Sequence, residues 1–467
     1  MHGETIVSGT SLIITANGTN EVWSAGSSGP VWIVGQDFAN RPTFNRKMVI
    51  TGSYVYFDTI YCRAPGRFQP SSPTAGYPAD HVVLRNSEVE GSVLYPGSTI
   101  SVEGAETSTV SNVVIYNNVF HNAGDINADY DQDSHIATVG IYSSNVWFLK
   151  NTLHTSNGSG AQVGGAYNGY DNCHHIYFGD NHVYNTRQAG LAVKYASDVI
   201  FSQNEIHDVV YTAWSVDKGI GFQYAPNRVW MIYNHIYNCS YGIYAGSTNS
   251  PPPDWYVYVI GNLIHDIELD PAMVYNPENS WAAAGIMMAG GTYKYIINNT
   301  LYKVIGGIYC PSSVAHYIEN NIISEVTRND GYHVFMDTGI GASLSTLNNN
   351  IFFQTGRDEK IKWSSTYVGN LSYIQSNAGV GQNSYDSDPQ FVDVLTNSFR
   401  LGENSPAIDN GVAHNVYNTF QTLYGIDITE DLVGTNRPVN EIFDIGAYEF
   451  GGTDVINPNS PTGLAVL

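Results

Sequence analysis

The sequence is poor in charge, and poorest in positive charge. Only 13% of its 467 residues are charged, and 42 acidic residues stand against 19 basic ones, which gives a formal net charge of −23. Such a chain repels other polyanions, so nucleic acids and anionic membrane surfaces are excluded as expected partners. It also lacks any apolar run long enough to cross a bilayer, and we expect no membrane insertion.

Cysteine is scarce, and the four cysteines are far apart at positions 62, 173, 239 and 310. Their separations exclude the closely spaced ligand pairs of zinc sites. Cys239 and Cys310 lie beside Gly-Ile pairs, where small apolar side chains pack well. We therefore expect free thiols in the interior rather than disulfides.

A secretory leader is also missing from the first residues, Met-His-Gly-Glu. The richness in Tyr, Asn, Ser and Gly nevertheless favours a secreted, extracellular protein from which a leader has been removed. Residues 456–467 resemble the linker and first strand of a fibronectin-type module, which predicts that a further module follows them. We expect a monomer.

What the sequence does contain is a repeat. An asparagine followed by apolar residues recurs at uneven intervals of 22 to 37 residues, and an earlier copy has Ser87 in its place. The asparagines are Asn118, Asn151, Asn181, Asn204, Asn234, Asn262, Asn299, Asn321 and Asn350. A local pattern that survives uneven spacing indicates a solenoid with variable loops.

Each copy predicts short strands rather than helices. Around Asn204, Val199 and Phe201 alternate with Ile200 and Ser202, which is the period of a half-buried strand. A second short strand follows, as in Gly219–Phe222. Stacked copies of such strands make an all-β, single-stranded parallel β-helix, and the repeated asparagines would hydrogen-bond to one another along its axis.

The last part of the chain lacks the repeat and carries a different set of short motifs. From Asp386 to Glu449 it carries Ser-Asp-Pro-Gln-Phe, Ser-Pro-Ala-Ile-Asp-Asn-Gly and Asp-Ile-Gly-Ala-Tyr-Glu. This run resembles the closing segment of bacterial secreted right-handed β-helix proteins. The resemblance implies a right-handed β-helix domain over residues 1–455, with regular coils at about 80–355 and a C-terminal cap at about 386–450. Asp409, Arg437, Asp444 and Glu449 are expected to form structural pairs there.

The outer face of the second strand is a candidate binding surface. The residue after each glycine points inward and the next one outward, so a stripe of outward side chains runs along the axis. Small residues and Lys194 lie in its middle, with tyrosines toward its ends. This predicts a groove that stacks sugar rings on aromatic residues, with Tyr142, Gln162, Gln223, Tyr244 and Tyr309 as substrate-binding residues.

The sharpest cluster of polar side chains precedes His135. Its oxygen-bearing residues alternate along one loop and are Asp125, Asn127, Asp129, Asp131 and Asp133. Carboxylates so close together repel one another unless a cation intervenes, and hard oxygen ligands suit Ca²⁺. Tyr130 departs from the glycine of an EF-hand loop. We expect a calcium site of another kind.

Lys194, as a basic residue in the central stripe, is a candidate general base. Together with the acidic loop it resembles the constellation of the β-helix polysaccharide lyases, above all the family 9 pectate lyases. The resemblance implies that calcium neutralises a uronate carboxylate while Lys194 removes the neighbouring proton. His135 is a further catalytic candidate because it interrupts the otherwise regular placement of histidines.

A glycoside hydrolase is the main alternative, because a cleft poor in bases suits a neutral glycan. Such an enzyme needs two carboxyl groups at a fixed separation. The candidate acids are Asp133, Asp171, Asp180, Asp217 and Asp270. A uronate epimerase, a phage-like adhesin and a non-catalytic glycan-binding protein also remain open.

Most histidines follow the repeated asparagine and are expected to stack in a turn; these are His121, His154, His182, His207, His235 and His265.

Taken together, the repeat, the outward stripe and the acidic loop predict an extracellular polysaccharide-active β-helix, with β-elimination as the first reaction to test.

Overall fold

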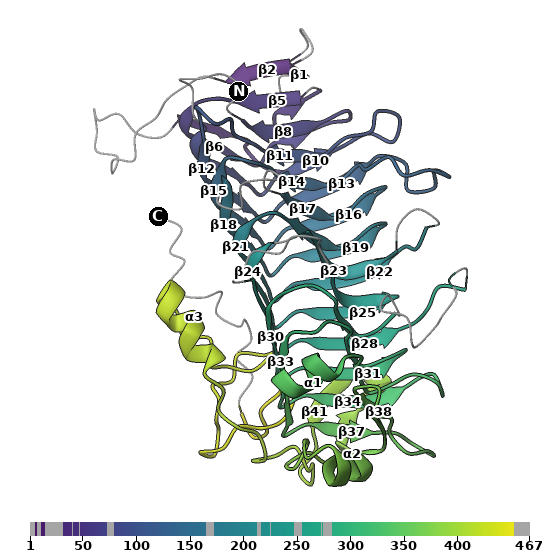
Figure 1. Ribbon diagram of the computed structural model, residues 1–467. Helices are drawn as coiled ribbons and strands as arrows, with labels where there is room; N and C mark the ends of the chain where they lie inside the picture. Colours follow the sequence, from purple (N-terminus) through teal and green to yellow (C-terminus); the bar gives the residue numbers. More distant parts are fainter. Residues whose placement is uncertain are drawn as a thin grey trace. The chain divides into compact units, whose positions relative to one another are not determined.

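The computed structural model describes residues 5–6, 11–14, 31–39, 41–45, 47–71, 79–164, 172–212, 216–224, 226–246, 255–271, 273 and 283–452. The chain falls into two compact units, Met1–Asn227 and Arg228–Leu467. In each unit, successive short strands belong in turn to three parallel sheets, named A, B and C below. Figure 1 shows the strands of each sheet stacked one above another.

In the first unit, sheet A contains β1 (Thr5–Ile6), β4 (Thr43–Phe44), β7 (Tyr61–Cys62), β10 (Glu88–Glu90), β13 (Val119–Ala123), β16 (Thr152–Ser156), β19 (His182–Thr186) and β22 (Glu205–Val209). Sheet B contains β2 (Ser11–Ile14), β5 (Lys47–Ile50), β8 (Arg67–Pro70), β11 (Ile100–Val102), β14 (Ala137–Val139), β17 (Ala161–Gly164), β20 (Leu191–Lys194) and β23 (Lys218–Gln223). Sheet C contains β3 (Val31–Val34), β6 (Ser53–Asp58), β9 (Asp80–Arg85), β12 (Val110–Tyr116), β15 (Ser143–Leu149), β18 (Cys173–Gly179) and β21 (Ser197–Ser202).

In the second unit, sheet A contains β25 (His235–Cys239), β28 (Leu263–Ile267), β31 (Thr300–Val304), β34 (Ile322–Val326) and β37 (Ile351–Phe353). Sheet B contains β26 (Tyr241–Ala245), β29 (Ile286–Met288), β32 (Ile308–Cys310), β35 (Val334–Met336), β38 (Ile361–Trp363) and the antiparallel β39 (Tyr367–Gly369). Sheet C contains β24 (Asn227–Ile232), β27 (Tyr256–Ile260), β30 (Tyr293–Ile297), β33 (Ala315–Glu319) and β36 (Thr346–Asn348). The remaining elements are α1 (Gly339–Leu344), α2 (Leu371–Asn377), β40 (Phe391–Asp393), η2 (Val394–Thr396), β41 (Ser398–Leu401) and α3 (Val416–Tyr424).

The repeated asparagine lies in the tight turn between sheets C and A. The residue before it adopts a left-handed backbone in every described coil of the repeat, for example φ 53° at Asn117 and 65° at Gly261. This one residue redirects the chain, so the asparagine that follows points its side chain into the interior. Asn118, Asn204 and Asn262 are at most 2% exposed.

The asparagines form the ladder that the sequence predicts, within each unit. The Nδ2 group of Asn151 donates to Oδ1 of Asn181 at 3.0 Å, and Asn181 donates to Asn204 at 2.9 Å. In the second unit, Asn262 donates to Asn299 and Asn299 to Asn321, each at 2.9 Å. These bonds satisfy amides that would be costly to bury alone, and they fix the register between coils.

Apolar side chains fill the space inside the sheets. Phe148 stacks on Phe178 with ring centroids 4.4 Å apart, which repeats one side-chain position in successive coils. The four cysteines are free and buried, as expected, and burial raises the pKa of the Cys62 and Cys310 thiols to about 12. They act as small apolar side chains.

The closing segment contacts the turns of several coils of the second unit. Asn298 Nδ2 donates to the carbonyl of Asp444 at 2.9 Å, and the amide of Gly446 donates to the carbonyl of Asn320 at 2.8 Å. The side chain of Trp230 donates to the Tyr424 hydroxyl on α3 at 3.1 Å. The segment expected to cap the last coil therefore also lies along the flank of earlier coils.

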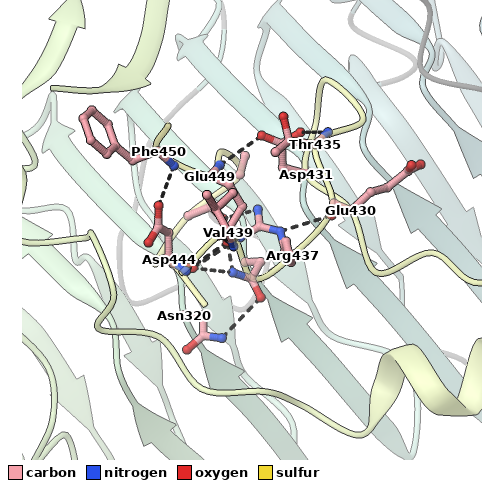
Figure 2. A network of polar contacts seen from close by, with 12 residues as sticks. Asn320, Glu430, Asp431, Thr435, Arg437, Val439, Asp444, Glu449 and Phe450 are labelled. Atoms are coloured by element: carbon pink, nitrogen blue, oxygen red, sulfur yellow. Dashed lines mark hydrogen bonds and ion pairs between the residues drawn. The ribbon is translucent and has the colours of Figure 1, made fainter. Parts of the chain in front are cut away.

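The charged residues of this segment form a buried network (Figure 2). Arg437 pairs with Glu449 at 2.6 Å and donates to the Gly446 carbonyl at 2.8 Å. Asp444 accepts from the amides of Asp409 and Phe450. Arg437, Asp444 and Glu449 have the structural role that the sequence predicts, whereas Asp409 contributes its backbone amide. Among the described residues, no helix has the length and apolar character needed to span a membrane.

Candidate functional site

Three strands of sheet B in the first unit carry the predicted outward stripe. Gln162 on β17, Ala192 on β20 and Gly221 on β23 are register partners, and so are Lys194 and Gln223. Ala192 has a small side chain and Gly221 has none, so the surface is recessed at the middle of the stripe. Longer polar side chains stand on either side of it, as the alternation of the sequence predicts.

A second lysine occupies this low region. Gly221 has room for the side chain of Lys218, because a Cβ atom at position 221 would lie 2.8 Å from Lys218 Cδ. The Lys218 Nζ group donates to the Val216 carbonyl at 2.9 Å. The stem of Lys218 thus folds back over the outer face of its own strand, β23.

Burial lowers the pKa of Lys218 to about 8. The negative charge of Asp217 opposes this shift and the positive charge of Lys194 adds to it. Desolvation disfavours the charged ammonium, so part of the Lys218 population is a neutral amine near neutral pH. A neutral amine in a pocket is a candidate base or nucleophile.

Lys194 and Lys218 line one pocket. Its other lining residues are Ser159, Gln162, Gln188, Ala189, Ala192, Val193, Gly221 and Gln223. Gln162 Oε1 is buried and accepts no hydrogen bond from the described residues. A buried acceptor beside a pocket is placed to receive a donor from a ligand, such as a sugar hydroxyl.

The acidic loop is shaped by bonds to its own backbone. Asp125 Oδ1 accepts from the amide of Asn127 at 2.9 Å, and Asp131 Oδ1 accepts from the amide of Asp133 at 2.8 Å. Among the described residues, no three of these loop carboxylates bring ligand atoms together within 4.8 Å. The Asp125 and Asp131 carboxylates therefore each stabilise a local turn, and the five-residue calcium site expected from the sequence stays a prediction.

Two carboxylates of the loop do converge, and they converge on a residue of the pocket. Gln188 Nε2 donates to Asp131 Oδ2 at 2.8 Å and to Asp133 Oδ1 at 3.1 Å. Because Gln188 also lines the lysine pocket, the loop and Lys194 lie close together despite their separation in sequence. The His135 imidazole holds the pKa of Asp133 well below its usual range, and the charge of Lys194 lowers it further.

His135 is a buried side chain beneath the loop, only 3% exposed. The amide of Ser159 donates to its Nδ1 at 2.9 Å, so the ring proton is on Nε2, 3.2 Å from Asp133 Oδ1. This fixes the tautomer, and the Nε2–Asp133 contact is electrostatic, because Nε2 makes no hydrogen bond of good geometry among the described residues. His135 is therefore placed to position Asp133 rather than to reach a polymer.

Several predicted site residues lie elsewhere. Tyr142 is in a turn after β14, and Thr138 takes the register position opposite Gln162. The strand ends at Val139, before the Gly-Ile pair used to predict its register. Asp180 lies in the turn before the ladder and pairs with Lys150 at 3.4 Å. Asp171 is outside the described residues.

The predicted tyrosines of the second unit share a register but are not open to a ligand. Tyr244 pairs with Met287 and Met287 with Tyr309 on sheet B. Tyr244 is 3% exposed and Tyr309 is fully buried, stacked on Phe335 with ring centroids 5.1 Å apart. The expected sugar-stacking surface is absent at these two residues, since aromatic neighbours already cover them.

Lys218 was not predicted from the sequence, because strand alternation alone was used to decide which side chains point inward and which point outward. Lys218 begins its strand, where alternation places it inward, yet its long stem turns outward over Gly221. A lysine followed three residues later by a glycine at an outward position was the available signal.

A comparison with known families identifies a match at residues 75–264 with the model described as "Right handed beta helix region". The fold is therefore a right-handed parallel β-helix, as predicted. No curated protein sequence matches the chain significantly.

Similar solved structures include pectate lyase Pel9A, at 13% identity over 95% of this chain and 85% of that one, with a TM-score of 0.35. A mannuronic-acid-specific family 6 polysaccharide lyase from human gut microbiota has 13% identity over 77% of this chain and 72% of its own, with a TM-score of 0.36. The Dettilon tailspike protein has 13% identity, 77% and 64% coverage and a TM-score of 0.34.

Proposed function

We propose that this β-helix is an extracellular polysaccharide lyase that cleaves a uronate-containing glycan by β-elimination in the pocket of Lys194 and Lys218. The observation that carries the proposal is the paired lysines, of which Lys218 has a pKa lowered to about 8. A base with a pKa near the working pH combines the right protonation state with adequate basicity.

The two lysines have different roles in the proposed reaction. Lys218 takes the proton on C5 of the uronate, beside its carboxylate. The electron pair of that C–H bond forms the C4–C5 double bond as the C4–O bond breaks, and the departing sugar oxygen takes a proton from solvent. Lys194 supplies positive charge to the substrate carboxylate, which makes the C5 proton more acidic. The sequence alone assigned the base to Lys194; burial favours Lys218.

Calcium is proposed as an aid to binding, held by fewer residues than the sequence predicts. Asp131 and Asp133 already converge, and rotating the Gln188 amide would turn its Oε1 toward the same point. This oxygen donor set suits Ca²⁺, which would offset the repulsion between an acidic protein and a polyuronate. Asp125, Asn127 and Asp129 are not part of this smaller set.

The hydrolase alternative has less support. The described residues lining the pocket include two lysines and three glutamines but no carboxylate. Asp217, one of the predicted acids, is not among the residues that line the pocket, and its charge acts on Lys218. A hydrolase needs two carboxyl groups that reach the glycosidic bond.

The test is incubation with polygalacturonate, alginate and neutral glycans, with calcium and with chelator. The ultraviolet absorbance of unsaturated uronate ends is recorded together with total reducing ends. Lyase action raises both, and Lys218→Ala abolishes both. Lys150→Ala is the matched control, since Lys150 pairs with Asp180 outside the pocket. Reducing ends without absorbance would refute β-elimination and favour hydrolysis.

A further inference from the structure

A histidine-rich cluster on sheet A of the first unit has no part in the proposed reaction. His182 on β19 and Glu205 on β22 are register partners, and His207 lies two residues after Glu205. One ligand atom from each of these three side chains lies within 4.8 Å of the other two. Residues two apart on a strand point to the same face, so β19 and β22 present the three groups together.

The two imidazoles lie close enough to share a metal ion after a small movement. His182 Nε2 and His207 Nε2 are 2.8 Å apart, the distance of a hydrogen bond between them. Two nitrogens at about 2.0–2.1 Å from one tetrahedral ion lie about 3.3–3.4 Å apart. For both to coordinate one ion, the rings must separate by about 0.5 Å and the proton between the two nitrogens must leave.

Neighbouring groups orient His207 for coordination. Its Nδ1 lies 2.8 Å from Asp208 Oδ2, which places a proton on Nδ1 and leaves the lone pair of Nε2 toward the cluster. This is the carboxylate–histidine arrangement found behind metal ligands. The Tyr184 ring stacks on His207 with centroids 5.4 Å apart and an interplanar angle of 5°, which limits rotation of the imidazole.

The second unit contains the same pair of histidines without the carboxylate. His235 Nε2 and His265 Nε2 are 2.7 Å apart, and Asp266 accepts from His265 Nδ1 at 2.7 Å. The register partner of His235 is Leu263, in the place that Glu205 has opposite His182. His265 is only 1% exposed. The histidine pair thus recurs on the strands of sheet A, not in the turn expected from the sequence, and Glu205 adds a third ligand to one copy.

We infer that His182, Glu205 and His207 bind a divalent transition-metal ion of the Zn²⁺ class. Two imidazole nitrogens and one carboxylate suit zinc, and three protein ligands leave a fourth position for water. Bound there, the ion joins the neighbouring coils of β19 and β22. The site lies on sheet A, whereas Lys194 and Lys218 lie on sheet B, so it is separate from the lysine pocket.

The experiment is titration of the full chain, after treatment with chelator, with ZnCl₂ followed by calorimetry. We expect a saturable site that takes one ion. His207→Ala and Glu205→Leu should remove it, and Asp208→Asn should weaken it by about 10–100-fold. His265→Ala is the matched control and should leave it unchanged.

The Glu205→Leu variant reproduces the arrangement of the second unit, so it is expected to fold. Its melting temperature in chelator should match that of the unsubstituted chain, and only the unsubstituted chain should gain thermal stability on adding ZnCl₂. No saturable binding in the unsubstituted chain, or equal binding in Glu205→Leu, would overturn the assignment.

Discussion

Arg437 and Glu449 form an ion pair of 2.6 Å from which solvent is excluded, with side chains 0% and 1% exposed. The remaining Arg437 donors reach the carbonyls of Glu430, Asp444 and Gly446. Glu449 in turn accepts from the amides of Val439 and Asp444. The pair is therefore the centre of the closing segment.

Glu449→Gln should destabilise the protein by about 3–5 kcal/mol, because it leaves the Arg437 charge buried and uncompensated. The measurement is the free energy of unfolding in denaturant. Asp330→Asn breaks the exposed pair of Asp330 with Arg328 and should cost no more than about 1 kcal/mol. Equal losses for the two variants would contradict the assigned role of burial.

Glu430 should make stability depend on pH. Burial raises its pKa to about 7 in the folded protein, above its value of about 4.3 in an unfolded chain. The folded state holds the proton more tightly, so this contribution is complete below about pH 4 and is lost as pH rises through about 7. Glu430→Gln should flatten that part of the stability profile. The exposed Glu441→Gln control should keep the slope of the unsubstituted protein.

Lys218→Ala should lower the rate of elimination by about 10²–10⁴-fold, the usual contribution of a general base. In the unsubstituted enzyme, activity should rise with pH through about 8 as Lys218 loses its proton. Lys218→Arg keeps a permanent charge and should be as inactive as the alanine variant. A retained rising limb in Lys218→Ala would assign the base to another group.

Gly221→Ala tests the position of the Lys218 stem without changing a charged residue. The added Cβ would lie 2.8 Å from Lys218 Cδ, so the stem must move. We expect lower activity and a shifted pH–rate profile. Gly164→Ala is the control on β17, since among the described residues its Cβ meets only the Lys194 carbonyl oxygen, at 3.7 Å. Identical profiles for both variants would contradict the packing of Lys218 against Gly221.

Asn299→Ala should destabilise the second unit by at least about 1–3 kcal/mol, because it leaves the buried amide groups of Asn262 without their acceptor. Thermal unfolding followed by circular dichroism measures the loss. Asn418→Ala, on the exposed face of α3, is the control and should change stability by less than about 0.5 kcal/mol. Comparable losses would mean that the ladder adds little to stability.

The features predicted well from sequence are those fixed by local repetition. The ladder and the register of Gln162 with Ala192 both follow from a pattern repeated at each coil. The features predicted poorly are those that depend on which side chains from other coils pack over the outer face of a strand. Alternation predicted Tyr309 as a substrate-binding residue, but it gave no sign that the side chain would be fully buried and stacked on Phe335.

The site shows the same division between local pattern and long-range contact. Alternating oxygen donors predicted a calcium site but gave no sign that Asp125 and Asp131 also accept hydrogen bonds from backbone amides of their own loop. Asp133 meets Gln188 from 55 residues away, a contact set by stacking of coils rather than by spacing in the loop. The lowered pKa of Lys218 arises from burial of a stem whose direction alternation does not determine.

The asparagine ladder has a direction and an end. In both units the side-chain amides donate to the next asparagine along the sequence, as far as Asn350. The same amides also donate to a backbone carbonyl of the preceding coil. Serine hydroxyls lie at the extremes, where Ser87 Oγ accepts from the Ile60 amide and Ser384 Oγ from the Asn350 amide. Every interior coil thus offers the same donor and the same acceptor to its neighbours. A whole coil is an interchangeable module, and excising or duplicating one between two asparagines restores the broken bonds at the junction. The length of this protein is thereby free to change in steps of one coil.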